Sequence, residues 1–351
     1  MQRDALAGRI PVTVLTGFLG SGKTTLLAHL LTHPGMNRVA VVINELGEVG
    51  IDHDLVSVQT ENMTLLANGC VCCSVRTDLQ ETLRELFAQR RSGAVFDFDR
   101  VIVETTGLAD PAPVVQLFAL DTLIGTHFRL DGIVTLVDAV NGHSTLERQP
   151  EAVKQAAIAD RLLVTKSDLA DAAELDVLRA ELHQLNPSAA RRDVLMGEVE
   201  PAFLLDLGLR NARSDAAAVD RFLGIDTGSK TGERAGDPSA PAYLGSRLGG
   251  IHDRSIKTFS LRFDTPFTWP VFTAAMELLT ALRGPDLLRV KGIVNVEGDP
   301  VVVQGVQHVF HPPAPLAAWP GEDHTTRLVF ITRGIEPHTV RALIEAASAL
   351  G

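Results

Sequence analysis

A glycine-rich segment near the amino end of the chain has the residue types and spacing of a phosphate-binding loop. The segment reads GFLGSGKTT from Gly17 to Thr25, and it lies between an apolar run at 12–16 and a leucine-rich stretch at 26–31. Glycines let backbone N–H groups turn toward phosphates, the lysine neutralises phosphate charge, and the threonine hydroxyl can ligate Mg²⁺. We therefore predict a nucleoside triphosphate site that includes Gly17, Gly20, Ser21, Gly22, Lys23, Thr24 and Thr25, with Thr24 on the magnesium ion.

A second motif places an acid at the end of an apolar run. Residues 101–104 end in Glu104, and Gly107 follows three positions later. In phosphate-binding-loop proteins an element of this form approaches the magnesium ion and the terminal phosphate. We expect Glu104 on the side of the magnesium and the attacking water, and Gly107 as an N–H donor to the terminal phosphate. An ordinary strand end followed by a turn is the alternative.

A third motif concerns the base of the nucleotide. A strand expected at 161–164 runs directly into Thr165, Lys166, Ser167 and Asp168. An aspartate there can accept hydrogen bonds from both N1–H and the exocyclic amine of guanine, while the lysine stem packs on the base. Adenine does not offer that pair of donors. The sequence therefore favours GTP over ATP, with Lys166 and Asp168 in the base site.

The three cysteines of the chain stand together as Cys70, Cys72 and Cys73. They precede a helix expected from about Thr77, and the field of a helix amino terminus favours the thiolate, which is both a metal ligand and a nucleophile. Soft sulfur ligands suit zinc, copper(I) or cobalt better than calcium or magnesium. We expect a transition-metal site that Glu48 helps to complete. A redox pair and inert buried thiols are the alternatives.

Composition limits the classes of protein that fit this sequence. The chain has 351 residues and a formal net charge of −11. Its length predicts two domains, and its acidity argues against broad binding of nucleic acid, which needs a basic face. The first residues have no pattern of a signal peptide, and no apolar run reaches membrane-spanning length. We expect a cytoplasmic protein that does not bind membranes.

The order of apolar and amphipathic segments predicts the fold. Strands and helices alternate through the first half, which indicates a doubly wound, mostly parallel α/β sheet. Its strands are expected at 12–16, 38–44, 101–104, 133–137 and 161–164, with helices at 147–159 and 174–185.

The last third of the chain predicts a separate domain. A segment rich in glycine, serine and proline at 226–250 is typical of a linker. Beyond it, strands are expected at 255–263, 288–296, 301–310 and 328–333, with helices at 268–282 and 337–350. We predict a nucleotide-binding domain at 1–225, a linker at 226–250 and a smaller α+β domain at 251–351.

Taken together, these motifs resemble those of the CobW-type metallochaperone GTPases, also called the cobalamin-synthesis W protein family, and of its YjiA-like branch. The resemblance covers nearly the whole chain, and it rests on GFLGSGKTTLL at 17–27, NELGEVGID at 44–52, NGCVCC at 68–73, ETTGLADP at 104–111, TKSD at 165–168, RVKG at 289–292 and QGVQHVF at 304–310.

The resemblance implies GTP hydrolysis coupled to the delivery of a transition metal to a client protein. Zinc is the metal most often handled in the family, and cobalt or iron in specialised branches. By their place in the motifs, Cys72, Cys73 and Glu48 would be metal ligands, and Cys70 could join them. Intrinsic hydrolysis is expected to be slow, because the sequence shows no arginine finger or clear catalytic base.

Two other functions fit the same residues. One is a metal or redox sensor that binds GTP and regulates a partner without transferring metal. The other is an ATP-driven enzyme that uses the cysteines as redox groups. The client protein is not indicated by the sequence, and a homo-oligomer is compatible with it.

Overall fold

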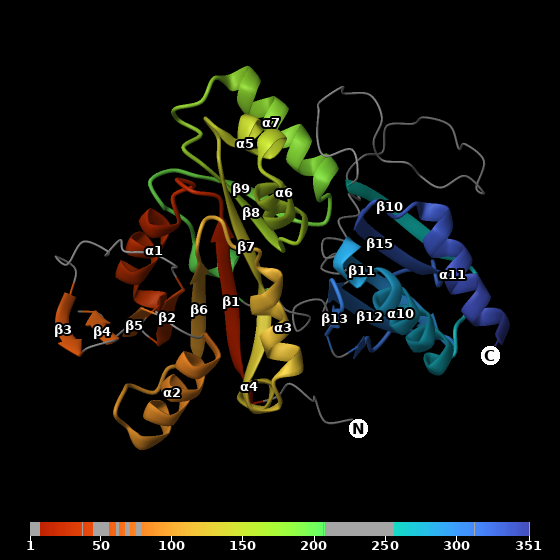
Figure 1. Cartoon of the computed structure of the whole chain (residues 1–351), viewed down its shortest axis with the longest axis horizontal. Helices are drawn as coiled ribbons and strands as arrows, with labels where there is room; N and C mark the ends of the chain where they lie inside the picture. Colours follow the sequence, from red (N-terminus) through yellow and green to blue (C-terminus); the bar gives the residue numbers. More distant parts are fainter. Residues whose placement is uncertain are drawn as a thin grey trace. The chain divides into compact units, whose positions relative to one another are not determined.

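The structure of the chain is a computed structural model, and it describes residues 8–36, 38–44, 56–60, 63–66, 71–74, 79–205, 207, 256–311 and 313–350 (Figure 1). The chain divides into two compact units. The first contains Met1–Thr145, Ala159–Leu178 and Arg191–Gly208, and the second contains Leu146–Ile158, Arg179–Ala190 and Leu209–Gly351. The linker expected at 226–250 lies outside the described residues, so the predicted domain boundaries stay predictions.

The first unit is built on one large sheet with β1 (Ile10–Gly17) at its centre. Nine described strands follow the order β3-β4-β5-β2-β6-β1-β7-β8-β9. Six neighbouring strands, β5 to β8 in that order, are parallel. The strands of the sheet are β2 (Val39–Asn44), β3 (Val56–Thr60), β4 (Met63–Leu66), β5 (Val71–Ser74), β6 (Arg100–Thr105), β7 (Phe128–Asp138), β8 (Arg161–Thr165) and β9 (Ala190–Val194).

The parallel strands contain continuous apolar runs because helices cover both faces of such a sheet. Val12, Val14, Val101, Val103 and Ile133 are all fully buried. This burial explains why continuous apolar runs, and not alternating patterns, marked the strands in the sequence. The predicted strands at 12–16, 38–44, 101–104, 133–137 and 161–164 all occur, and the doubly wound architecture is confirmed.

Helices connect the strands of the sheet. They are α1 (Lys23–Thr32), α2 (Leu79–Ser92), α3 (Ala112–Leu120), α4 (Thr122–His127), α5 (Gly142–Arg148), α6 (Pro150–Ala157), α7 (Ala172–Leu185) and α8 (Pro201–Leu204), with a short 3₁₀ turn, η1, at Pro34–Met36. The helix expected at 147–159 occurs as α6, but it begins at Pro150, and residues 147–148 end α5 instead. Two helices occupy this region because Pro150, which has no N–H to donate, begins the second one.

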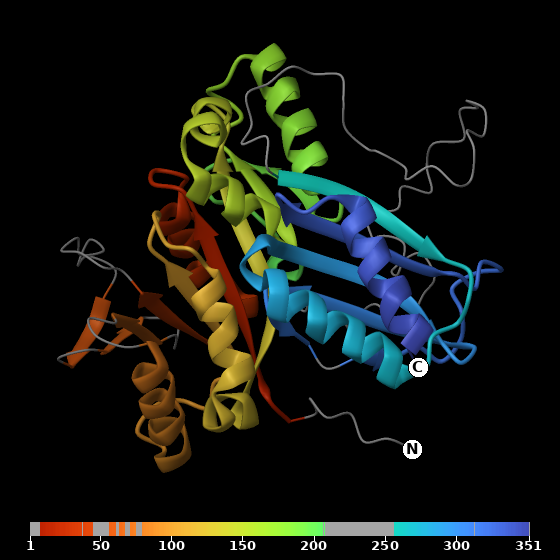
Figure 2. The same cartoon turned by 45° about the vertical axis from the view of Figure 1, so that its right-hand side comes forward.

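The second unit contains an antiparallel sheet covered by two helices. The sheet has the order β10-β15-β11-β12-β13, and β14 pairs with β12. Its strands are β10 (Ile256–Phe263), β11 (Leu287–Val296), β12 (Asp299–Val306), β13 (Val309–Phe310), β14 (Ala314–Pro315) and β15 (Thr326–Arg333). In Figure 2, α10 (Trp269–Arg283) and α11 (Pro337–Leu350) lie side by side over one face of this sheet. A 3₁₀ turn, η4 (Gly284–Asp286), follows α10.

A difference from the expected strands arises at 301–310. One continuous strand was predicted there, but a turn at Gln307 separates β12 from β13. Gln307 has a φ of 53°, in the left-handed region, which a continuous strand cannot accommodate. The smaller α+β domain is otherwise confirmed. Among the described residues, no helix is long and apolar enough to cross a membrane.

Candidate functional site

The glycine-rich segment forms a tight turn at the carboxyl end of β1 and leads directly into α1. The N–H of Ser21 donates to the Phe18 carbonyl over 3.1 Å, which closes the turn. Gly17 has a φ of 146°, and a Cβ atom there would lie 2.5 Å from the Leu136 carbonyl oxygen. Gly22, with a φ of 90°, is the residue that precedes the first turn of α1. The backbone path of this turn therefore requires glycine at both positions.

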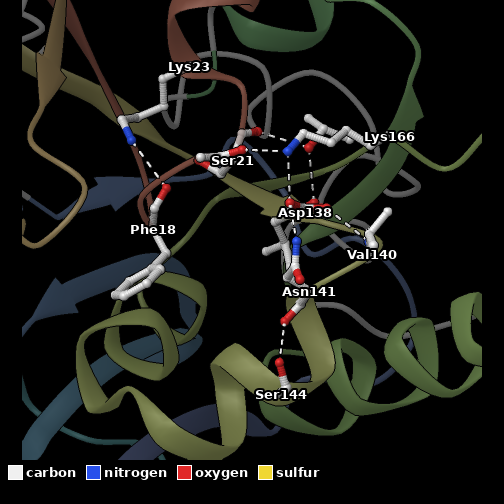
Figure 3. Close-up of polar contacts among 11 residues, drawn as sticks. Phe18, Ser21, Lys23, Asp138, Val140, Asn141, Ser144 and Lys166 are labelled. Carbon is white, nitrogen blue, oxygen red and sulfur yellow. Dashed lines mark hydrogen bonds and ion pairs between the residues drawn. The ribbon is translucent and has the colours of Figure 1, made fainter. Parts of the chain in front are cut away.

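Lys23 curls back over this turn. Its Nζ atom donates to the Gly17 carbonyl over 2.7 Å and to the Phe18 carbonyl over 3.3 Å, as Figure 3 shows for Phe18. The residue is only 8% exposed. Thr24 and Thr25 stand in the first turn of α1 and are exposed. The buried ammonium thus lies within the loop, while the two hydroxyl-bearing residues are open to a ligand at the helix amino terminus.

Glu104 and Gly107 come close to this turn through strand β6, which pairs with β1. Glu104 is in register with Leu15 of β1 and is 2% exposed. One residue further, the hydroxyl of Thr105 donates to the hydroxyl of Thr16 over 2.8 Å. Gly107 packs against Leu19, and a Cβ atom on Gly107 would lie within 3 Å of Leu19 backbone atoms. The structure therefore brings the second motif against the first.

The third motif reaches the same turn through β8. The Lys166 Nζ atom donates to the Gly20 carbonyl over 2.8 Å, and the Thr165 hydroxyl donates to the Ser21 carbonyl over 2.8 Å. Asp168 is exposed two residues further along. Lys166 therefore contacts the glycine-rich turn, and Asp168 follows it two positions later. The role of both residues in reading the base of a nucleotide stays a prediction.

Asp138 belongs to this site, although its role was not predicted from the sequence. It ends β7, and its Oδ2 atom accepts a hydrogen bond from Lys166 over 2.8 Å (Figure 3). Burial by itself would raise the pKa of Asp138, but hydrogen bonds from Lys166, Asn141 and the Val140 N–H together bring that pKa below its usual value. The carboxyl group is therefore ionised at neutral pH. The signal that could have found it is an acid at the end of a buried strand, as for Glu104.

The cysteine motif lies partly outside the described residues, which do not include Cys70 and Glu48. Cys72 and Cys73 belong to strand β5, between β4 and β2. The sequence predicted only that these cysteines precede a helix, so the strand is a difference. The segment at 71–74 is extended because it pairs with strands on both sides, with Cys72 in register with Val41 of β2 and with Thr64 of β4.

The register places this cysteine strand in line with the nucleotide motifs. Ser74 of β5 pairs with Ile43 of β2, and Ile43 pairs with Glu104 of β6. Cys73 is therefore one residue out of register with Glu104, and β2 is the one strand that lies between their two strands. No group of three or more possible metal ligands of the His, Cys, Asp or Glu type occurs among the residues that the structure describes.

Comparison with known proteins gives a consistent result. The family model for the CobW/HypB/UreG nucleotide-binding domain matches residues 11–192, and the model for the C-terminal domain of the cobalamin synthesis protein CobW matches residues 256–348. The chain is 31% identical to the zinc chaperone YjiA of Escherichia coli over 336 residues, which are 95% of this chain and 97% of that protein. It is also 31% identical to the zinc chaperone CobW of Pseudomonas aeruginosa, over 97% of this chain and 92% of that protein.

A solved structure extends the similarity to the fold. The crystal structure of the Zn(II)-bound YjiA GTPase from E. coli matches with a TM-score of 0.73 and 28% identity, over 97% of this chain and 99% of that one. The glycine-rich turn, the acid-ended strand β6 and the lysine and aspartate after β8 occupy one edge of the sheet, and the first family model covers all three motifs. The chain therefore belongs to the CobW/HypB/UreG family of P-loop GTPases.

Proposed function

We propose that this GTPase is a metallochaperone that binds zinc at Cys70, Cys72 and Cys73, with Glu48, and couples GTP hydrolysis to the transfer of zinc to a client protein. The observation that carries the proposal is the register of the sheet, in which the strand of Cys72 and Cys73 is separated from that of Glu104 by β2 alone. Relatives over almost the whole chain are named zinc chaperones. That naming supports zinc as the cargo.

In this proposal the nucleotide is held by the turn that the structure describes. Backbone N–H groups of Gly20 and Gly22 and the Lys23 ammonium would bind the phosphates, and the Ser21 N–H would join them in exchange for its bond to the Phe18 carbonyl. Lys23 would exchange its hydrogen bonds to the Gly17 and Phe18 carbonyls for bonds to phosphate oxygens. Lys166 and Asp168 would bind guanine, and Gly107 would donate its N–H to the terminal phosphate.

The donor atoms at the amino terminus of α1 and at the end of β6 suit a magnesium ion. Thr24 offers a hydroxyl oxygen and Glu104 a carboxylate oxygen, and Mg²⁺ prefers such hard oxygen ligands. When bound, the ion would neutralise the negative charge that develops on the phosphate oxygens. Thr24 and Glu104 are the residues that would hold it.

Thiolate ligands at positions 70, 72 and 73 would bind a soft or borderline ion such as Zn²⁺, with Co²⁺ as a chemically related alternative. Because β5 and β6 belong to one sheet with β2 between them, a movement of the turn that follows β6 at 106–110 could reach the cysteine strand through β2 alone. The coupling of zinc and nucleotide affinity would amount to about 1–3 kcal/mol, the usual range for linked sites. A client protein, a cytoplasmic setting and client recognition by the C-terminal domain are parts of the same proposal.

The proposal is tested by measuring zinc affinity in each nucleotide state. Anaerobically purified protein is titrated with zinc in the presence of a non-hydrolysable GTP analogue and of GDP, and about a five- to 150-fold difference in zinc affinity is expected. Equal affinities in the two states would contradict the coupling. Cys72→Ala should weaken zinc binding and leave GTP binding unchanged. Lys23→Ala should weaken GTP binding and leave zinc binding unchanged.

A transfer assay separates a chaperone from a sensor. Zinc-loaded protein is mixed with a zinc-free zinc enzyme, and recovery of that enzyme's activity is followed with GTP or with the non-hydrolysable analogue. Recovery that requires hydrolysis supports delivery. If zinc passes at the same rate with either nucleotide, or not at all, the delivery step is wrong and a GTP-binding metal sensor becomes the better reading.

A further inference from the structure

The Lys166 ammonium is fixed between two groups from different parts of the sheet edge. It donates to the Gly20 carbonyl of the P-loop over 2.8 Å and to the Asp138 carboxylate at the end of β7 over 2.8 Å. Figure 3 shows the lysine side chain spanning the space between the P-loop and Asp138. Three segments that are far apart in the sequence are thereby joined through one nitrogen atom.

The carboxylate of Asp138 is itself held in place. Its Oδ1 atom accepts the N–H of Val140 over 2.9 Å, and its Oδ2 atom accepts the side-chain amide of Asn141 over 3.1 Å. The side chain is 10% exposed, whereas that of Lys166 is 38% exposed. An ion pair with one partner so enclosed is more fixed in direction than a pair on the open surface.

The backbone of Lys166 needs such a restraint. Its φ of 57° lies in the left-handed region, which residues with a Cβ atom rarely adopt and which persists where surrounding contacts hold it. This conformation begins the turn that carries Asp168, and the turn is closed by a hydrogen bond from the Leu169 N–H to the Lys166 carbonyl. The direction of the Asp168 side chain therefore depends on the conformation at Lys166.

We propose that Asp138 is a positioning residue for guanine recognition, which it serves by fixing Lys166 against the P-loop. The proposal rests on the proposed role of Lys166 and Asp168 in binding the base. With Asp138 ionised and in place, the lysine stem keeps one orientation under the base, and Asp168 meets both guanine donors. Without that charge, the Lys166 ammonium keeps its hydrogen bond to the Gly20 carbonyl but loses its ion pair, and the geometry of the base site is no longer fixed.

The test uses Asp138→Asn, which preserves the shape of the side chain and removes its charge. GDP affinity is expected to fall about tenfold, the effect of losing one charge-assisted hydrogen bond. The preference for GDP over IDP should fall as well, because inosine lacks the exocyclic amine that Asp168 would accept. If Asp138 had a purely structural role, Asp138→Asn would lower the affinities for GDP and IDP by the same factor. Unchanged GDP affinity, or a weaker affinity with an unchanged GDP-to-IDP ratio, would overturn the proposal.

A double-mutant cycle shows whether Asp138 acts through Lys166. On a Lys166→Ala background, Asp138→Asn should cause no further loss of GDP affinity, whereas additive losses would contradict the proposal. Asp97→Asn is the matched control, because Asp97 forms ion pairs with Arg38 and Arg90 in the same unit but its side chain is 72% exposed. It should leave GDP binding unchanged.

Two further variants keep the outcome clear. Asn141→Ala retains the Asp138 carboxylate and removes one of the hydrogen bonds that hold it. GDP affinity should therefore fall by about two- to threefold, less than in Asp138→Asn. This variant can replace Asp138→Asn if that protein does not fold. Asp168→Ala tests the proposed base site itself. If Asp168→Ala abolishes the preference for GDP over IDP and neither Asp138→Asn nor Asn141→Ala changes it, the role of Asp138 alone is wrong. If Asp168→Ala keeps the preference, the base site is wrong.

Discussion

Gly107 lies so close to Leu19 that a Cβ atom on Gly107 would stand 2.7 Å from the Leu19 backbone nitrogen. The turn after β6 and the P-loop are therefore in contact through a position that has room for hydrogen alone. Replacing Gly107 by alanine should push the two segments apart. We expect Gly107→Ala to lower the rate of GTP hydrolysis by about ten- to 100-fold, the cost of misplacing groups around the transferred phosphate, and to leave GDP affinity nearly unchanged.

Phosphate release under saturating GTP and a separate GDP titration measure the two quantities. Gly321→Ala is the control, because no atom lies within 4 Å of the position where its Cβ would be. That variant should hydrolyse GTP like the original chain. A Gly107→Ala protein with full hydrolytic activity would show that this contact opens easily.

The hydroxyl pair of Thr16 and Thr105 joins the end of β1 to the end of β6 in the buried interior. Neither residue is exposed, and the two oxygens are 2.8 Å apart. Thr105→Val keeps the shape and leaves the Thr16 hydroxyl without this partner. We expect the free energy of unfolding of this unit to fall by about 1–3 kcal/mol, measured by urea denaturation.

A second substitution checks the cause of that loss. Replacing both threonines by valine removes both polar groups, so part of the stability should return. Thr32→Val is the surface control, since the Thr32 hydroxyl bonds to the His29 carbonyl at an exposed position. If the double replacement were as unstable as the sum of the single ones, the hydroxyl pair would not be the source of the effect.

The pH dependence of the Asp138 contribution follows from the direction of its pKa shift. Burial opposes the charged form, yet the hydrogen bonds from Lys166, Asn141 and Val140 prevail and lower the pKa in the folded protein. An aspartate in the unfolded chain has a pKa of about 3.9. The stabilising contribution is therefore complete above that value and is lost as pH falls through the lower pKa of the folded state.

We therefore expect the difference in unfolding free energy between the original chain and Asp138→Asn to be constant from about pH 7 to pH 5 and to shrink below about pH 4. Comparing the two proteins cancels the carboxyl groups that they share. Denaturant titrations at each pH measure the difference. A difference that grew as pH fell would show that the pKa of Asp138 is raised instead.

The core of the C-terminal unit gives a prediction that is independent of nucleotide. Phe330 is fully buried in β15, and its ring stacks on that of Phe259 in β10 with centroids 5.5 Å apart. Phe330→Ala should lower the free energy of unfolding of this unit by about 3–5 kcal/mol, because it leaves a cavity in the apolar core that the sheet shares with α10 and α11. Leu282→Ala, at a position 63% exposed, is the control and should change little. Calorimetry measures both.

Local sequence patterns were sufficient for most of the fold. Continuous apolar runs identify the buried parallel strands because covering helices leave no polar face, and the spacing of Gly17, Gly22 and Lys23 identifies the P-loop because its backbone path excludes other residues. Asp138 was missed because its partner, Lys166, lies 28 positions away in the sequence. The two residues meet only when β7 and β8 pair in the folded sheet. Short extended segments such as 71–74 depend on pairing with neighbouring strands, which a local pattern does not reveal.

Because β1 lies at the centre of the sheet, its amide protons should exchange with solvent much more slowly than those of the P-loop that follows it. Its residues from Val12 to Leu15 pair with β6 on one side and with β7 on the other, so their amide protons exchange with solvent when the unit unfolds as a whole. The P-loop turn that follows pairs with none of the described strands and is closed by the backbone hydrogen bond from the Ser21 N–H to the Phe18 carbonyl, with side-chain bonds from Lys23, Thr165 and Lys166. Deuterium on the backbone amides of β1 should therefore be retained through many cycles of nucleotide binding and release. Deuterium on the amides of the P-loop should be lost each time the loop opens.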